Sequence, residues 1–175
     1  GMTGAQTFIL SDVPKVMEEY AGKKVAFFTT NCGMQEPLQA AVLKEANAYY
    51  PLPCCPSPFH GFPSSLELEV EPEEWGNVET YLRKMAARLN ELGAINRVST
   101  WPVGVNMSII LGGFEYAKDY IENGGERVDL AKLHEVMTKV ASQSPDLTTY
   151  VDADGNNITN YFMIFFDRVD FNDYL

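Results

Sequence analysis

The sequence has few of the residues that build disulfide frameworks, membrane spans or nucleic-acid surfaces. Three cysteines among 175 residues are too few for a disulfide-built scaffold, and they leave the redox compartment open. Basic residues are scarce, because 13 Lys and Arg stand against 24 Asp and Glu, a net charge of −11. Such an acidic surface repels phosphate backbones, so we expect no nucleic-acid partner. No apolar run approaches the roughly 18 residues of a membrane-spanning helix.

The amino terminus shows no export signal. The apolar run from Thr7 to Leu10 is too short for the core of a signal peptide, and no basic segment precedes it. Gly1 before Met2 is typical of a cleavage scar from expression. We therefore expect a fragment, or a single lobe, of a longer two-lobe protein, and the sequence leaves a cytoplasmic location open.

Hydrophobic residues make up 46% of the chain, enough for one globular domain over residues 1–175. Apolar periodicity, helix caps and breakers predict alternating strands and helices. The predicted strands cover 24–30, 48–52 and 95–100, and the predicted helices begin near 11, 35, 72, 106 and 129. Residues 66–70 are predicted as a strand fragment or an extended connection, and a hairpin with its turn at 152–156 closes the chain.

This alternation predicts the α/β class, because right-handed crossovers join parallel strands. The expected architecture is a three-layer α/β/α domain with a mostly parallel, doubly wound sheet and a C-terminal β-hairpin. In such a sheet the loops that follow the strands emerge at one edge, where ligands bind. Here these loops are 31–37, 54–63 and 101–106. They predict one binding site made of Asn31, Cys32, Cys54, Cys55, Phe59, His60, Phe62, Trp101 and Asn106.

The most unusual of the three loops is Cys54-Cys55-Pro56-Ser57-Pro58-Phe59-His60-Gly61-Phe62-Pro63. Its prolines exclude a helix or a central strand. With Cys32 from the preceding loop, its thiols and His60 allow four interpretations. They are a soft-metal site, a disulfide from Cys32 to Cys54 or Cys55, a nucleophilic or acid–base thiol assisted by His60, and inert buried thiols. Adjacent cysteines do not easily share one tetrahedral ion, so we predict no metal and no cofactor.

Two further motifs do not match their templates. His134-Glu135 lacks a second histidine four residues after the first, so it is not a zinc-protease motif. The segment 152–156 resembles the start of a calcium loop, but the twelfth position is Met163 rather than Glu. A solvated helix side chain and a hairpin turn explain these two motifs.

Three segments carry a family resemblance: TTNCGMQEPL, YYPLPCCPSPFHGFP and STWPVGVNM. They resemble the C-terminal half of an uncharacterised bacterial family of envelope proteins and lipoproteins, over residues 7–171. The resemblance implies one lobe of a fold similar to type I periplasmic binding proteins, in which two lobes hold a small ligand between the carboxyl edges of their sheets. It also implies a location in the cell envelope, and it brings no catalytic residues.

The sequence thus supports three hypotheses. The first is a small-molecule-binding module, in which Asn31 and Asn106 donate or accept hydrogen bonds and aromatic side chains form apolar walls. The second is a cysteine-dependent enzyme, similar to a racemase or amidohydrolase, that uses Cys32 or Cys54 with His60. The third is a structural or interaction domain whose exposed edge packs on a partner lobe or a second copy. Asn31 has a purely structural interpretation as well, as a helix cap or turn residue.

Overall fold

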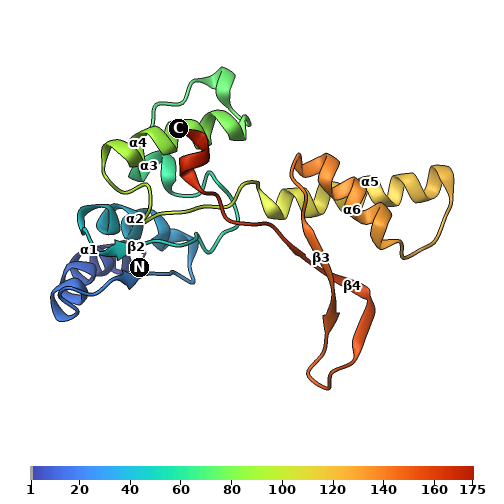
Figure 1. Cartoon of the computed structure of the whole chain (residues 1–175), viewed down its shortest axis with the longest axis horizontal. Helices are drawn as coiled ribbons and strands as arrows, with labels where there is room; N and C mark the ends of the chain where they lie inside the picture. The colour runs from blue at the N-terminus through green and yellow to red at the C-terminus, as the bar shows by residue number, and fades with distance from the viewer. Residues whose placement is uncertain (1) are drawn as a thin grey trace. The chain divides into compact units, whose positions relative to one another are not determined.

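The computed structural model describes residues 2–175 and divides the chain into two compact units (Figure 1). Unit 1 consists of the chain up to Trp101 together with Arg168–Leu175, and unit 2 is Pro102–Asp167. The sequence predicts one domain, whereas the two units are described separately below. Gly1, interpreted above as a cleavage scar, lies outside the described residues.

Unit 1 contains nine helices and strands among its described residues. They are α1 (Met2–Glu19), β1 (Val25–Ala26), η1 (Cys32–Met34), α2 (Gln35–Lys44), β2 (Ala48–Tyr49), α3 (Phe62–Ser65), η2 (Pro72–Glu74), α4 (Val78–Glu91) and η3 (Phe171–Tyr174). Unit 2 contains α5 (Val105–Asn123), α6 (Leu130–Ala141), β3 (Asp146–Val151) and β4 (Asn157–Phe165). Among the described residues, neither unit contains a helix that is both long enough and apolar enough to cross a membrane.

The sheet of unit 1 is parallel, as predicted, but short. Strand β1 pairs with β2 in the register Val25↔Ala48, and a single parallel bridge from Tyr50 to Val98 continues the sheet on the far side of β2. The α/β class is therefore confirmed. The predicted long strands over 24–30 and 95–100 shrink to two residues and to one bridge, and residues 66–70 form no strand.

One face of this sheet is open. The chain adds its strands in sequential order, β1, β2 and then Val98, and right-handed crossovers in that order place both connecting helices on the same face. Lys24, Ala26 and Phe28 alternate along the other face and are all exposed, Phe28 by 61%. Within the described residues of unit 1, the third layer that the sequence predicts is therefore not confirmed.

The hydrophobic core lies mainly in unit 1. Its largest fully buried side chains come from Tyr50, which directly follows β2, from α2, α3, α4 and η3, and from the connections between them. The ring of Phe62 lies edge-on to those of Tyr50 and Phe171, with centroids 6.2 and 6.3 Å away. The cluster also buries apolar residues of α1, α2 and α4 and the residue that follows α3: Val13, Leu38, Ala41, Val42, Leu82, Met85, Ala86, Leu89 and Leu66.

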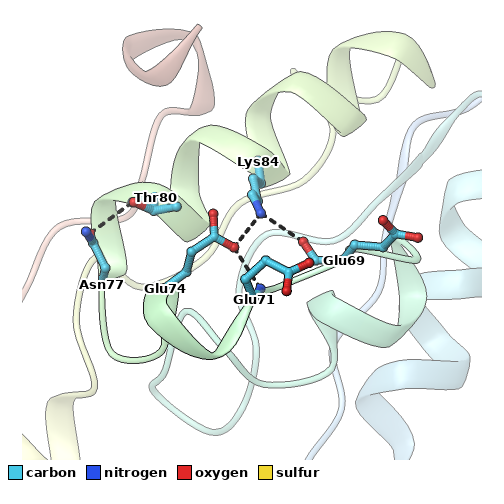
Figure 2. Close-up of polar contacts among 6 residues, drawn as sticks. All are labelled: Glu69, Glu71, Glu74, Asn77, Thr80 and Lys84. Atoms are coloured by element: carbon cyan, nitrogen blue, oxygen red, sulfur yellow. Dashed lines mark hydrogen bonds and ion pairs between the residues drawn. The ribbon is translucent and has the colours of Figure 1, made fainter.

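The start of α4 is fixed by polar contacts, shown in Figure 2. Asn77 caps the helix by accepting a hydrogen bond from the Thr80 backbone N–H, at 3.2 Å. In the preceding turn, the Glu74 carboxylate accepts from the Glu71 N–H at 2.9 Å and pairs with the Lys84 ammonium at 2.5 Å. Lys84 also donates to the Glu69 carbonyl at 2.9 Å. These contacts hold the chain against α4 where residues 66–70 form no strand.

Helix α1 differs from its prediction. It begins at Met2 rather than near Ser11, and Pro14, which was predicted in the first turn, lies inside the helix. The N-terminal segment carries no residue that forces a break, so the helix extends through it. Val13 reaches the core with 3% exposure.

In unit 2, α5 and α6 pack through a small contact surface. Val105, Ser108 and Gly112 are the buried residues of α5, and Gly112 lies against Met137 of α6. Asp129 caps α6 as predicted, accepting from the Lys132 N–H at 2.9 Å. The cap of α5 differs from the prediction, because Gly104 is its N-cap and the predicted cap Asn106 lies inside the first turn.

The predicted hairpin is present as β3 and β4, with a register irregularity between Thr149 and Tyr150. Its turn is closed by Asp152, whose carboxylate accepts from the backbone N–H groups of Asp154 and Asn156 at 3.0 and 2.8 Å. These hydrogen bonds lower the pKa of Asp152, that of Asn156 contributing most. The interpretation of this segment as a turn therefore holds.

Candidate functional site

The first two predicted loops meet at the carboxyl edge of the unit 1 sheet, joined by a disulfide. The bond links Cys32, in η1 after β1, to Cys55, in the loop after β2, with 6.2 Å between their Cα atoms. A disulfide is one of the four interpretations that the sequence left open for these cysteines. Cys54 remains a free, half-buried thiol.

The Cys32 side of this corner is ordered by short-range hydrogen bonds. The Asn31 side-chain oxygen accepts from the Gly33 backbone N–H at 2.9 Å, which caps η1. The Gln6 amide of α1 donates to the Gly33 carbonyl at 3.1 Å. Asn31 is exposed, and its structural role as a cap is present here. Its predicted role toward a ligand stays a prediction.

The Cys54–Cys55 side is held by contacts that do not involve sulfur. The Trp101 indole N–H donates to the Pro53 carbonyl at 2.9 Å, and the Gln39 amide donates to the His60 carbonyl at 3.2 Å. Gly61 adopts φ +80°, and a Cβ there would lie 2.8 Å from the Gln39 Oε1 atom. A side chain at position 61 is therefore excluded by both backbone conformation and space.

The three aromatic residues that were predicted to line the site differ in how far they are buried. Phe59 is half-buried and lies edge-on to Tyr81, with ring centroids 4.7 Å apart. Trp101 is half-buried and fixed by its indole hydrogen bond. Phe62 is 1% exposed and belongs to the hydrophobic core, so it presents no surface to a ligand in this structure. The Pro-rich composition around Phe62 gave no sign of this burial.

Asn106 belongs to unit 2, where it is exposed in the first turn of α5. The other eight predicted site residues belong to unit 1. The structure thus brings Cys32, Cys55 and His60 together, with Cys54 beside Cys55 in the chain, and assigns Asn106 to a separate body.

A buried polar cluster beneath this corner was not predicted from the sequence. Gln35 and Gln39, one turn apart on α2, are 0% and 1% exposed. The Tyr50 hydroxyl donates to the Gln35 Oε1 atom at 3.2 Å, and burial raises the pKa of Tyr50 to about 12. Among the described residues, no hydrogen-bond partner is found for the buried Gln35 Nε2 and Thr29 Oγ1 atoms. The available signal was the spacing of the two glutamines, which places them beside Leu38 and Val42 on the buried face of α2.

The disulfide decides which thiol is available for chemistry. Cys32 is oxidised, so in this state only Cys54 could act as a nucleophile. The ligand atoms of Cys32, Cys55 and His60 lie within 4.8 Å of one another, and they form the group of potential metal ligands found among the described residues. Cys32 is exposed, and Cys55 and His60 are half-buried.

A cavity of about 340 Å³ lies on the open face of the sheet rather than at the disulfide corner. Three cationic side chains stand around it, although the protein is acidic overall: Lys24, Arg97 and Arg168. Arg97 already donates to the Val42, Glu45 and Ala48 carbonyls. The remaining lining residues are Ala26, Tyr49, Pro51, Asn96, Val98 and Ser99.

A family model described as a protein of unknown function (DUF3798) matches residues 1–99. This range contains the disulfide, both loops and the whole predicted site except Trp101 and Asn106. The chain belongs to the DUF3798 family. No curated protein matches it in sequence.

The fold is similar to that of a crystal structure described as a "Putative transcriptional regulator from Clostridium difficile 630". The TM-score is 0.80 with 16% sequence identity, which shows a shared fold. The match covers 96% of this chain and 46% of that one. The DUF3798 chain therefore spans about half the length of this structural neighbour.

Proposed function

We propose that this chain is one part of a small-molecule-binding protein of the periplasmic-binding-protein type, with its ligand contacts at the disulfide corner. The observation that carries the proposal is the Cys32–Cys55 bond, which joins the loops after two consecutive parallel strands. The carboxyl edge of a parallel sheet is where α/β proteins bind ligands. Fixing two loops there reduces the conformational entropy lost on binding.

The surroundings of the disulfide suit a small polar ligand. His60 lies beside it and is half-buried, the preceding residue Phe59 is half-buried as well, and Asn31 is exposed. They offer an imidazole, an aromatic ring and an amide, a mixture of polar and apolar groups that is typical of such sites. The family resemblance of the segments around Cys32 and Cys55 agrees with this proposal.

The rest of the binding site would come from chain that is absent here. The structural neighbour of the same fold is about twice as long. Among the described residues, side chains on the open sheet face of unit 1 and apolar residues of α5 in unit 2 are exposed, Ile110 and Phe114 by 62% and 63%. A further lobe, or a second copy, would bury such surfaces. An envelope location is part of the same proposal, and the disulfide supports it because disulfides persist in oxidising compartments.

A DNA-binding role is a weaker proposal for this chain. The description of the structural neighbour names a transcriptional regulator, but the net charge of −11 opposes contact with a phosphate backbone. For residues 1–175 the charge therefore favours the small-molecule proposal over a nucleic-acid one.

The test is ligand mapping by NMR on the oxidised, isotope-labelled chain. Separate panels of amino acids, monosaccharides and nucleosides would be titrated, and backbone amide shifts followed. We expect one class to shift amides of residues 31–34 and 54–61 while the turn at 152–156 stays unchanged. His60→Ala should weaken this binding, and His134→Ala, in unit 2, should not. Shifts confined to the cavity on the open sheet face would contradict the proposal, as would no shift with any class.

A further inference from the structure

Three groups that bind soft metal ions converge at the disulfide corner. The Sγ atoms of Cys32 and Cys55 and a ring nitrogen of His60 all lie within 4.8 Å of one another. Two ligands of one tetrahedral zinc ion are about 3.5–3.8 Å apart, given zinc–sulfur and zinc–nitrogen bonds of about 2.3 and 2.0 Å. The His60 nitrogen would therefore have to approach the sulfur atoms by about 1 Å at most, and the two sulfur atoms, which are bonded to each other in the disulfide, would have to separate on reduction.

The histidine is available as a ligand. Its backbone carbonyl accepts the hydrogen bond from Gln39, whereas its imidazole ring makes no hydrogen bond among the described residues. The ring is half-buried and the Cys32 side chain is exposed, so an ion and a small reductant can both reach the corner. Two thiolates and a neutral imidazole form the donor set of three-ligand zinc sites.

We propose that reduction of the Cys32–Cys55 disulfide converts this corner into a zinc site, with Cys32, Cys55 and His60 as ligands and a fourth position open. In the oxidised chain the same two sulfur atoms are bonded to each other and cannot coordinate as thiolates. The corner would thus exist in one of two mutually exclusive states, either as a disulfide or as a zinc site. This inference does not depend on the proposed small-molecule binding.

A small dithiol supplies the two electrons that reduce the Cys32–Cys55 disulfide. One thiolate of the dithiol attacks the exposed Cys32 sulfur, which breaks the protein disulfide and releases the Cys55 thiolate. The second thiol of the reductant then displaces Cys32, and the reductant leaves as its own disulfide. Two electrons pass to the protein sulfurs, which take up two protons. Binding of Zn²⁺ by both thiolates then releases those protons, so affinity should rise with pH.

The positions of Cys32, Cys55 and His60 do not depend on the disulfide alone. The Asn31 cap and the Gln6–Gly33 bond hold the Cys32 side. The Trp101–Pro53 bond and the Gln39–His60 bond hold the other side. We therefore expect the three ligands to stay close together after reduction.

The experiment compares zinc binding to the reduced and oxidised chain. Reduced protein is freed of dithiol under anaerobic conditions, and Zn²⁺ affinity is measured by competition with a chromophoric chelator. Co²⁺ replaces Zn²⁺ to report tetrahedral sulfur coordination by its absorption spectrum. We expect one tightly bound Zn²⁺ per reduced chain and none at the same free concentration in the oxidised chain. Far-UV circular dichroism follows the fold throughout.

Matched variants separate the ligands from their neighbours. His60→Ala and Cys32→Ser should each weaken Zn²⁺ binding by about tenfold to a hundredfold or more, since even the loss of supporting groups has effects of that size. His134→Ala and Cys54→Ser should leave the affinity unchanged. The proposal is overturned if oxidised and reduced chains bind equally, if His60→Ala behaves like His134→Ala, or if Cys54→Ser weakens binding as Cys32→Ser does. Loss of the folded spectrum on reduction would also overturn it.

Discussion

The two units bury their apolar residues to very different extents. In unit 1 the core cluster runs through α2, α4 and η3, and Val42, Tyr50 and Leu89 are fully buried. In unit 2 the large apolar residues of α5 face outward, and Ile121 is 80% exposed. Unit 1 also carries the disulfide, whereas unit 2 contains no cysteine.

This difference indicates which part of the chain can be stable by itself. Helix α5 buries only Val105, Ser108 and Gly112, a narrow stripe for a helix of 19 residues. Its exposed apolar residues would lose contact with water only against another surface. Unit 1 has a core of its own, so we expect its stability to depend on internal contacts. Unit 2 should gain most from a surface that covers α5.

The largest expected effect is the loss of the disulfide. Replacing Cys32 and Cys55 together by Ser should lower the free energy of unfolding of unit 1 by about 3 kcal/mol, because the bond closes a loop across a separation of 23 residues. Both tryptophans, Trp75 and Trp101, belong to unit 1, so urea unfolding followed by their fluorescence reports this unit alone.

Amide exchange of α5 and α6 provides the comparison with unit 2, and it should stay unchanged in the double Ser variant. Cys54→Ser is the matched control and should leave the fluorescence transition in place. An equal loss of protection in both units would mean that they unfold together, and the contrast between them would not hold.

A second prediction concerns the packing of unit 2. Gly112→Ala would drive its Cβ into the Met137 side chain, which is 1% exposed and has little room to move. We expect a cost of about 1–3 kcal/mol, as for overpacked cores. Gly113→Ala is the matched control, because a Cβ there meets nothing within 4 Å, and it should stabilise the helix by up to about 1 kcal/mol.

Thermal melts followed by the circular dichroism of the helices would measure both glycine variants. Equal melting temperatures for the two would show that the α5–α6 contact does not hold unit 2 together.

The third prediction tests the buried polar cluster of unit 1. Tyr50→Phe would leave the Gln35 Oε1 atom without its partner, next to an Nε2 atom that already has none. The expected cost is about 1–3 kcal/mol. Tyr49→Phe, at the preceding, half-buried position, should cost less.

The raised pKa of Tyr50 predicts that the free energy of unfolding depends on pH. Its pKa rises from 10.0 to about 12 on folding, so the native state favours the neutral phenol. The stability from this shift is present below pH 10 and is lost as pH rises through 12. Urea midpoints between pH 9 and 12 should fall more steeply for the wild type than for Tyr50→Phe. Parallel curves would show that Tyr50 does not titrate differently in the two states.

Local signals in the sequence predicted local structure well. Asp129 caps α6, Gly124 ends α5, and Pro37 lies in the first turn of α2, as their capping and turn preferences indicate. The predicted topology alone also indicated that the loops of Cys32 and Cys55 meet, since loops after parallel strands emerge at one edge of the sheet.

Features that depend on distant chain were not predictable. The run Lys24–Thr30 looks like a strand covered on both faces, yet only Val25–Ala26 pair and Phe28 is exposed. Whether a second face is covered depends on segments that do not lie next to the strand in sequence. Phe62 was expected at a ligand and lies in the core, where it packs against Tyr50 and against Phe171 from the far end of the chain.

The smallest expected effect is electrostatic and concerns the start of α4 in unit 1. The Lys84 ammonium, and after it the Glu71 backbone N–H, lower the pKa of the Glu74 carboxyl below 4.5. Because folding lowers this pKa, the associated stability is present above pH 4.5 and is lost as pH falls through the folded value. Lys84→Met keeps most of the aliphatic chain and removes the charge, so the pKa of Glu74 should rise toward 4.5. It should not reach that value, because the Glu71 N–H still donates to the carboxylate.

An NMR titration of the Glu74 side-chain carboxyl would measure this pKa directly. Arg83→Met is the matched control, since Arg83 pairs with Glu79 rather than with Glu74 and its loss should leave the Glu74 titration unchanged. An unchanged pKa in Lys84→Met would show that the contacts of Figure 2 do not persist in solution. The segment before α4 would then be held by the packing of Leu66 and Leu68 on the core and by the hydrogen bond from Arg88 to the Leu66 carbonyl, and unit 1 would depend more on apolar burial than its polar contacts suggest.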